Sequence, residues 1–354
     1  MHSLNGKCDV EFDRLDNADW DEVIQQFDDA NLWQSSTYGH VAFGSEHLEQ
    51  VILRKNGSPV AAAQVAVVSI PFIPTQIAYV KYGPLWRPKN TKPDPENFRT
   101  MLSCLIDTYA IDQGKLLRLL PRVSGQVLGS MDDLVHGAAV HWRSRPAGGT
   151  YLLDLSPDLE TLRSQMRPRW RSKLNQSERG NLQVTEVASQ AGFEKFLAQY
   201  RAMLARKGFA DYSEFFRIPA LQTELPGQLK LKLFACFDGD DMAATSLCWT
   251  IGDTAIVLFG TTSETGRRLG ASYVLDWWLV QHLKKQGYAW MDLGGAGALS
   301  VNKYKRGLTG RDTSEVTFAG KFDFHLNPVV LSAFSFTETV RAKVHDFKAR
   351  WKSK

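Results

Sequence analysis

Residues 229–295 read LKLKLFACFDGDDMAATSLCWTIGDTAIVLFGTTSETGRRLGASYVLDWWLVQHLKKQGYAWMDLGG, and this stretch decides the fold class. Turn signals such as Asp238-Gly239 divide its first part into three apolar strands, because glycine supplies the positive φ that tight hairpin turns need. A longer segment follows and ends at Gly287, where a helix is expected to stop. The expected elements are strands at Leu229–Phe237, Met242–Ile251 and Ala255–Thr261, a helix at Leu269–Gln286 and a strand at Ala289–Leu293.

The first half of the chain has the same order of elements. Its first hairpin turn, Asn56-Gly57, lies 182 residues before Asp238-Gly239 (238 − 56), and the helix-ending Gly114 lies 173 residues before Gly287 (287 − 114). Few side chains are shared, so the repeat is one of pattern. The expected elements here are strands at Glu49–Arg54, Pro59–Val68 and Ile77–Tyr82, a helix at Glu96–Gln113 and a strand at Lys115–Leu120.

These patterns predict an α/β (α+β) chain of two tandem domains, each a mixed, mostly antiparallel sheet flanked by helices. An antiparallel meander, a helix and one further strand resemble the core of the GNAT acyltransferase fold. The alternative is a pair of unrelated α+β domains. The length agrees with two domains, because a single apolar core stops growing near roughly 250–300 residues and this chain has 354.

Composition narrows the class of protein. The formal net charge of +4 permits a polyanionic partner without requiring one. Four scattered cysteines lack zinc-ligand or redox spacing, which predicts reduced thiols in a cytoplasmic protein. The start of the chain has no apolar signal segment, and the longest apolar stretch, Val60–Ile73, is interrupted and too short to span a bilayer. We therefore expect no transmembrane segment.

Several catalytic classes find no support. The chain has no Gly-x-Ser-x-Gly nucleophile motif, so hydrolase chemistry is not indicated. It also has no His-Glu-x-x-His and no clustered histidines and cysteines, so we expect no catalytic metal and no bound cofactor.

The segment Arg267-Arg268-Leu269-Gly270-Ala271-Ser272 is a candidate phosphate site. It falls where a strand gives way to a helix, and free backbone N–H groups and the helix dipole favour an anion there. Gly270 permits close approach, Arg267 and Arg268 add charge, and Ser272 takes the last small position. The segment is similar to the pyrophosphate loop of CoA-dependent GNAT enzymes. Two solvated arginines before a helix are the alternative interpretation.

A basic run opens the second half of the chain. Such a run tracks an RNA backbone in some proteins and is a solvated helix face in others. Pro168 predicts a kink or break within it. Its members are Arg163, Arg167, Arg169, Arg171, Lys173 and Arg179.

Two later segments are candidates for chemistry. Asp292 ends a strand before Gly294-Gly295, where a carboxylate can accept a proton from an attacking amine or can cap the following turn. In Asn302–Gly307, the cations can stabilise a tetrahedral oxyanion or bind a diphosphate, or they belong to a basic surface loop.

Several stretches together resemble the Fem family of aminoacyl-tRNA-dependent transferases, also described as FemAB-like or peptidoglycan bridge-forming enzymes. Their order and spacing, from about Trp33 to Phe324, carry the resemblance more than any one of them. The stretches are Trp33–Tyr38, Ala78–Pro84, Tyr151–Leu155, Arg169–Lys173, Met203–Phe209, Gly270–Trp277, Met291–Gly295 and Lys303–Lys305.

The resemblance implies two tandem GNAT domains, with residues 1–149 on the acceptor side and 150–321 on the donor side. The segment 322–354, including a helix at Ser332–Lys348, is a candidate to complete the first domain. The implied reaction is attack of an acceptor amine on the ester of an aminoacyl-tRNA, which forms an amide. The acceptor is a cell-wall precursor or a related metabolite, and peripheral membrane contact is left open.

The resemblance also implies roles for individual residues. Lys305 stabilises the developing charge, Tyr304 flanks the cleft, and Asp292 orients the loop or takes the proton. Arg206 binds acceptor phosphate. The other candidate substrate-binding residues are Gln34, Tyr38 and Tyr82.

Departures from the family pattern keep other functions open. No lysine follows Tyr38 where the family binds its acceptor, and Tyr304 replaces a phenylalanine. The segment around Gly270 supports an acyl-CoA-dependent N-acyltransferase, acting in polysaccharide or exopolymer modification, as an alternative. A non-catalytic binding module on a GNAT scaffold is a third hypothesis.

Overall fold

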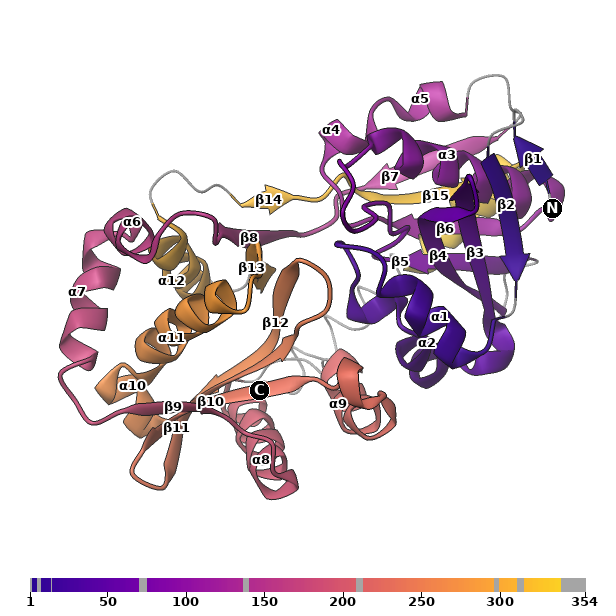
Figure 1. The fold of residues 1–354 in the computed structure, drawn as a ribbon. Helices are drawn as coiled ribbons and strands as arrows, with labels where there is room; N and C mark the ends of the chain where they lie inside the picture. The colour runs from indigo at the N-terminus through magenta and orange to yellow at the C-terminus, as the bar shows by residue number, and fades with distance from the viewer. Residues whose placement is uncertain are drawn as a thin grey trace. The chain divides into compact units, whose positions relative to one another are not determined.

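The computed structural model describes residues 2–4, 8–13, 15–69, 75–135, 140–207, 213–295, 299–310 and 315–338. The chain forms two units, of which unit 1 is Met1–Gly148 with Thr317–Lys354 and unit 2 is Gly149–Val316. Each unit has its own mixed sheet flanked by helices, shown in Figure 1. The expected α/β fold class, with two such sheets, is confirmed.

Unit 1 contains an eight-stranded sheet in the order β1-β2-β3-β4-β5-β6-β15-β7. Neighbouring strands run antiparallel except β5 and β6, which are parallel. The strands are β1 (His2–Leu4), β2 (Cys8–Asp13), β3 (Leu48–Lys55), β4 (Ser58–Ser69), β5 (Gln76–Lys81), β6 (Leu116–Leu120), β7 (His141–Arg145) and β15 (Lys321–His325). The helices are α1 (Asn17–Ile24), α2 (Ser36–Phe43), α3 (Pro95–Leu105), α4 (Gly125–Leu128) and α5 (Met131–Leu134), with a π-helical turn at Ile106–Asp112 after α3 and short 3-10 turns at Leu32–Gln34 and Ser45–His47.

Local sequence accounts for several elements of unit 1. Asn56 and Gly57 have φ values of 52° and 78°, so both central residues of the β3–β4 turn adopt the positive φ predicted for them. Asp94 caps α3 by accepting from the N–H of Glu96, and Pro95 follows it at the first helical position. Residues 328–338 are helical, and the expected helix residues 339–348 lie outside the described part of the chain.

Unit 2 contains a seven-stranded sheet in the order β14-β8-β13-β12-β11-β10-β9. The strands are β8 (Gly149–Asp154), β9 (Gln183–Glu186), β10 (Lys232–Asp238), β11 (Asp241–Trp249), β12 (Thr254–Thr262), β13 (Trp290–Gly295) and β14 (Val316–Thr317). The helices are α6 (Leu159–Gln165), α7 (Pro168–Ser177), α8 (Gln190–Lys207), α9 (Ser213–Glu224), α10 (Glu264–Leu269), α11 (Ala271–Lys285) and α12 (Leu299–Thr309), with a 3-10 turn at Gly227–Leu229. The meander β10–β11–β12 is antiparallel, as predicted.

Two helical segments of unit 2 differ from the sequence-based expectation. The single helix expected at Leu269–Gln286 is interrupted at Gly270, which adopts φ 72° and ψ 30° between α10 and α11. Residues 302–307, one interpretation of which was a surface loop, lie instead on α12. The break predicted at Pro168 is present, because Pro168 is the first residue of α7 and α6 ends before it.

The feature of unit 2 that forms the site is the divergence of β12 and β13. These parallel strands pair only from Thr254–Ile256 to Trp290–Asp292. Beyond the paired residues, β12 continues to Thr262 and β13 to Gly295 without pairing to each other. Helices α10, α11 and α12 lie on one side of β12, and α8 lies on the other (Figure 1).

The described cysteine side chains Cys104, Cys236 and Cys248 are buried free thiols, as their scattered spacing predicts. Within the described ranges, no helix combines the length and the apolar character needed to cross a membrane.

Candidate functional site

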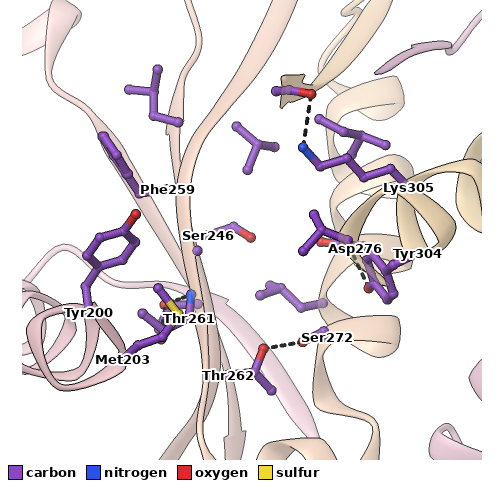
Figure 2. Close-up of a pocket in the computed structure, with 18 of the residues that line it drawn as sticks. Tyr200, Met203, Ser246, Phe259, Thr261, Thr262, Ser272, Asp276, Tyr304 and Lys305 are labelled. Atoms are coloured by element: carbon purple, nitrogen blue, oxygen red, sulfur yellow. Dashed lines mark hydrogen bonds between the residues drawn. The ribbon is translucent and has the colours of Figure 1, made fainter. Parts of the chain in front are cut away.

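A cavity of about 560 Å³ occupies the opening between β12 and β13. Side chains from both sides of β12 reach it: Tyr200 and Met203 come from α8, while Asp276 and Lys305 come from α11 and α12 (Figure 2). Because the two strands do not pair here, the cavity has free backbone edges as well as side chains in its wall. An extended ligand can therefore bind along the strands without displacing a sheet hydrogen bond.

Lys305 provides a fixed cation in this cavity. Its Nζ donates to the carbonyl oxygens of Gly294, at 3.0 Å, and Gly295, at 2.7 Å. An ammonium has three N–H donors, so one remains for a ligand. Burial lowers the pKa of Lys305 to about 8, against the opposing effect of the Asp276 charge. The positive φ of Gly294, 76°, places these carbonyls at the end of β13.

Asp276 and Tyr304 form a second polar group in the same wall. The Tyr304 hydroxyl donates to Oδ2 of Asp276 at 2.8 Å (Figure 2). Burial raises the pKa of Asp276 to about 6, although the Tyr304 hydrogen bond and the Lys305 charge act in the opposite direction. Burial and the Asp276 charge raise the pKa of Tyr304 well above its usual value, so this hydroxyl stays protonated.

The opposite wall is aromatic and hydroxylic. Tyr200 and Phe259 contact edge to face, with ring centroids 5.3 Å apart. The hydroxyls of Thr245 and Thr261 are hydrogen-bonded at 2.7 Å. Figure 2 shows Phe259 and Tyr200 on the far side of β12 from Lys305. The cavity thus has an apolar face opposite its charged groups.

Two smaller cavities, of about 430 and 240 Å³, adjoin the first. Arg206 and Arg267 line both of them, and Gly270 and Ser272 line the larger one. Both arginines are exposed. Together with the N-terminus of α11, this charge suits a phosphate group, as the sequence predicts for Arg267, Gly270 and Ser272.

In the predicted phosphate segment, Arg268 lies away from these cavities, and Gly270 and Ser272 have further contacts. Arg268 is exposed and does not line these cavities. Gly270 has a positive φ, and a Cβ at this position would lie 2.1 Å from Oγ of Ser177. The Ser272 hydroxyl is hydrogen-bonded to that of Thr262 at 2.6 Å. Gly270 and Ser272 therefore also hold α11 against α7 and β12.

Asp292 lies beside the cavity and not in its lining. It is 1 % exposed, and its Oδ1 accepts from the Gly294 N–H at 2.6 Å and from the Thr150 hydroxyl. Of the two roles considered for it, orientation of the loop fits this position better than proton transfer. The loop in question carries the carbonyls that bind Lys305.

The candidate substrate-binding residues of unit 1 are mostly internal. Gln34 is fully buried; its Nε2 donates to the Lys81 carbonyl and its Oε1 accepts from the Gln64 N–H. Tyr38 is 1 % exposed and accepts a 2.6 Å hydrogen bond from Lys81 Nζ. These contacts join α2 and the segment before it to β4 and β5, so the structure gives Gln34 and Tyr38 positions in the core in place of the expected ligand-facing ones.

Tyr82 is the more accessible of the three unit 1 candidates. It is partly buried and adopts a φ of 53°. Its ring contacts Trp33, with centroids 4.5 Å apart, and Phe318, at 6.2 Å. It therefore belongs to an aromatic cluster at the surface of unit 1. Gly208-Phe209, part of the family-like stretch after Arg206, lies outside the described residues, as does Gly297 after Asp292.

Sequence reasoning singled out Lys305 and Tyr304 but assigned no role to Asp276, Tyr200 or Thr262. A signal was available for Asp276, since it follows Ser272 by four residues and therefore lies on the same helix face. No comparable signal exists for Tyr200 or Thr262, because only the sheet and α8 bring them to the cavity. In the described parts of the chain, no group of three histidine, cysteine, aspartate or glutamate side chains is arranged for a metal ion.

An opened pair of parallel strands that follows a meander, with a helix N-terminus beside the gap, defines an acyltransferase fold of the GNAT type. A family model described as "Acetyltransferase (GNAT) domain" matches residues 163–306 of this chain. The match lies within unit 2, and it supports a transferase. A comparison with curated protein sequences finds no match.

Solved structures agree with this fold. One, described as FemX, has a TM-score of 0.69 and 13% identity, covering 88% of this chain and 96% of its own. The C-terminal domain of a protein described as a lysylphosphatidylglycerol synthetase, from Agrobacterium fabrum, has a TM-score of 0.55 and 13% identity over 90% of this chain and 96% of its own.

A third structure, L-PGS from Bacillus licheniformis, has a TM-score of 0.54 and 15% identity over 88% of this chain and 92% of its own. At these identities the likeness concerns the fold. The resemblance to Fem-like GNAT proteins that the sequence motifs indicate is confirmed at that level, and it extends over both units.

Proposed function

We propose that this protein is an aminoacyltransferase, which forms an amide between an amino acid carried by an aminoacyl-tRNA and an amine acceptor. The observation that carries the proposal is the fixed ammonium of Lys305 in the cavity between β12 and β13. The fold shared with FemX, with the lysylphosphatidylglycerol synthetase domain and with L-PGS supports aminoacyl transfer. The acceptor in this proposal is an amine on a cell-wall precursor or a related metabolite.

The proposed reaction places developing negative charge beside Lys305. The acceptor nitrogen attacks the ester carbonyl carbon, a C–N bond forms, and an electron pair moves to the carbonyl oxygen. The free N–H of Lys305 stabilises this oxyanion. When the C–O bond to the tRNA ribose breaks, the amide forms and the ribose oxygen takes the proton that the amine loses. Tyr304 and Asp292 hold the surroundings of Lys305, the first through Asp276 and the second through Gly294.

Basic groups from several helices support a polyanionic donor. Arg206 and Arg267 line the adjoining cavities. Tyr273 lines the larger of the two adjoining cavities. Burial raises the pKa of Tyr273, and the charge of Arg169 on α7 partly opposes this rise, so Arg169 is near the cavity. The ring of Trp170 packs against Tyr273 with centroids 4.9 Å apart, so α7 is adjacent to the same cavity. An RNA 3′ end that enters the main cavity would pass these cations.

Transfer by Lys305→Ala and Lys303→Ala variants tests the proposal. Both lysines lie on α12, but Lys303 is exposed and does not line the cavity. Loss of one charge-stabilising donor typically lowers kcat by about 10²–10³-fold. We expect that loss in Lys305→Ala and near-normal transfer in Lys303→Ala, measured as amide formation from charged tRNA with a panel of amine acceptors. Full activity of Lys305→Ala would remove Lys305 from the mechanism.

The acyl-CoA alternative also has a specific observation in its favour. The N-terminus of α11, Gly270 and Arg267 border a cavity that suits a diphosphate as well as an RNA phosphate. Side-by-side binding of charged tRNA and acetyl-CoA at two salt concentrations separates the two donors. Tight, salt-sensitive binding of charged tRNA without CoA binding supports the aminoacyltransferase, and the reverse result supports an N-acyltransferase.

A further inference from the structure

Asp276 is a carboxylate with little protein compensation in the wall of the main cavity. Its one hydrogen bond among the described residues is the 2.8 Å contact from the Tyr304 hydroxyl to Oδ2. Lys305 lines the same cavity, but its ammonium is bound to the Gly294 and Gly295 carbonyls, and it forms no ion pair with Asp276 in the described structure. Oδ1 of Asp276 is therefore left for a ligand.

Maintaining a carboxylate at this place is energetically unfavourable in the empty protein. Removal of a charged group from water is unfavourable unless a counter-charge or several hydrogen bonds compensate. The Tyr304 hydrogen bond and the nearby charge of Lys305 offset this cost only in part, because burial still raises the pKa of Asp276. If the only task of the position were to hold Tyr304, a neutral acceptor such as Asn or Gln would suffice. A carboxylate is the better choice when the ligand is a cation.

The chemistry of the proposed donor provides that cation. An aminoacyl ester carries an ammonium group on the carbon next to its carbonyl, so a positive group and the developing oxyanion are close neighbours. In the cavity, an anion on α11 and a cation on α12 line the same wall. Asp276 and Lys305 thus form a pair of opposite charges that complements the ammonium and the oxyanion (Figure 2).

We propose that Oδ1 of Asp276 binds the α-ammonium of the acyl donor and so selects acyl groups with a free amine over simple acyl groups. This inference rests on the proposed function, because it takes Lys305 as the site of the reacting carbonyl. It names the donor class: α-aminoacyl esters are accepted, whereas acetyl and N-blocked aminoacyl groups leave the partly buried Asp276 without a cation. Asp276 is then a specificity-determining residue that touches the donor beside the bond that breaks.

The test compares two ligands that differ only at the amine. One is 3′-alanylamino-adenosine, a stable amide analogue of the aminoacyl-tRNA end, and the other is its N-acetylated form. A charge-assisted hydrogen bond in a partly buried site corresponds to about a 10- to 100-fold difference in affinity. We expect the wild-type protein to prefer the free amine by that factor in calorimetric titration, and Asp276→Asn to bind both ligands with similar affinity.

Tyr304→Phe is the matched control, because it removes the hydrogen bond to Asp276 and keeps the carboxylate. We expect this variant to retain the preference for the free amine, which a purely structural role of the Asp276–Tyr304 pair would not allow. Equal affinities in the wild-type protein, no binding of either ligand, or an unchanged preference in Asp276→Asn would overturn the inference. If the preference holds while charged tRNA supports no transfer, the ammonium site stands and the proposed aminoacyl-tRNA donor fails.

Discussion

Lys305 carries the positive charge that stabilises an oxyanion only while its amine is protonated, and this gives the residue a pH signature. Burial lowers its pKa to about 8, so the ammonium is present below that pH and is lost above it. We predict that kcat/KM with charged tRNA falls as the pH rises through about 8. A guanidinium does not titrate in this range. We therefore expect Lys305→Arg to be less active than the wild-type protein, but its activity should not fall as the pH rises through about 8. A pH profile for both proteins, with Lys303→Ala as the control, measures this; an alkaline limb shared by Lys305→Arg would contradict it.

Gly270 has two structural reasons to be glycine, and they can be separated. Its φ of 72° costs a residue with a side chain about 1–2 kcal/mol, and an added Cβ would lie 2.1 Å from Oγ of Ser177. We predict that Gly270→Ala destabilises unit 2 by more than the backbone cost alone. In a Ser177→Ala background the collision is relieved, so the same substitution should cost less.

Urea unfolding of Gly270→Ala, Ser177→Ala and the double variant forms a double-mutant cycle for these two positions. Additive changes in the free energy of unfolding would mean that the collision with Ser177 does not contribute to the cost of a side chain at position 270. The same variants, measured for acetyl-CoA and charged tRNA, would show whether loss of binding at Gly270 exceeds the loss of folded protein.

The sequence predicts a functional residue most readily where its place in the site is determined by the helix or strand on which it lies. Lys305 and Tyr304 lie on one helix, and Arg267, Gly270 and Ser272 lie at one helix start, so local patterns brought them to notice. Gln34 and Tyr38 could not be judged in this way. Polar residues near the start of the chain suit a ligand site and also suit internal hydrogen bonds, and only the positions of β4 and β5 show that the second applies.

Among the helices, α7 carries the largest part of the basic run, which the sequence allows to be either an RNA-binding surface or a solvated helix face. Arg167, Arg169 and Lys173 are exposed on or beside it, whereas Arg163 on α6 is bound to Glu178 and Asn175. We predict that Arg167→Gln, Arg169→Gln and Lys173→Gln together weaken tRNA binding and reduce its salt dependence, because each phosphate contact adds roughly 0.7–0.9 to the slope of log affinity against log salt.

Arg163→Gln is the control for this triple variant, since its guanidinium already has partners at the end of α7, Asn175 and Glu178, and should contribute little. Fluorescence anisotropy with labelled tRNA, at several salt concentrations, measures both the affinity and the slope. A triple variant with wild-type affinity and slope would show that this side of α7 is only a solvated face.

The elements themselves were predictable to different degrees. The hairpin at Asn56-Gly57 and the meander β10–β11–β12 follow from turn positions with a positive φ, which only a few residue types adopt readily. The break between α10 and α11 was harder to foresee, because a glycine near the start of a helical segment is compatible with a continuous helix. In the structure, Gly270 adopts the left-handed conformation with Ser177 packed close to it, and the Ser272–Thr262 hydrogen bond lies two residues further along the chain.

At the scale of the whole molecule, the sequence pattern predicts a repeated meander but not the completion of each sheet. In unit 1, β15 pairs with β6 and with β7, across more than 170 residues of sequence, and no local pattern encodes such pairing. Besides this backbone pairing, side chains of β15 that face distant partners stabilise it. Phe322 and Phe324 join the apolar core of unit 1, and Asp323 between them pairs with Arg118 on β6.

The Arg118–Asp323 ion pair attaches β15, a late part of the chain, to β6. Two hydrogen bonds of 2.6 and 2.8 Å join the guanidinium to the carboxylate, and their side chains are 9% and 3% exposed. Glu338, at the end of the helical residues 328–338, also binds Arg118, and the ring of Phe334 lies 4.3 Å from the guanidinium carbon. One buried arginine therefore ties β6, β15 and the following helix together.

We predict that Asp323→Asn lowers the stability of unit 1 by about 3 kcal/mol, because removal of one partner leaves a buried charge incompletely paired and Glu338 replaces only part of the loss. Glu11→Gln is the matched control: it breaks the Arg54–Glu11 pair in the same sheet, but these side chains are 26% and 30% exposed, and such pairs contribute at most about 1 kcal/mol. Thermal and urea unfolding of the two variants measures the difference. Equal, small effects would mean that apolar contacts of Phe322 and Phe324 alone hold β15, and that its pairing with β6 does not depend on the charge between them.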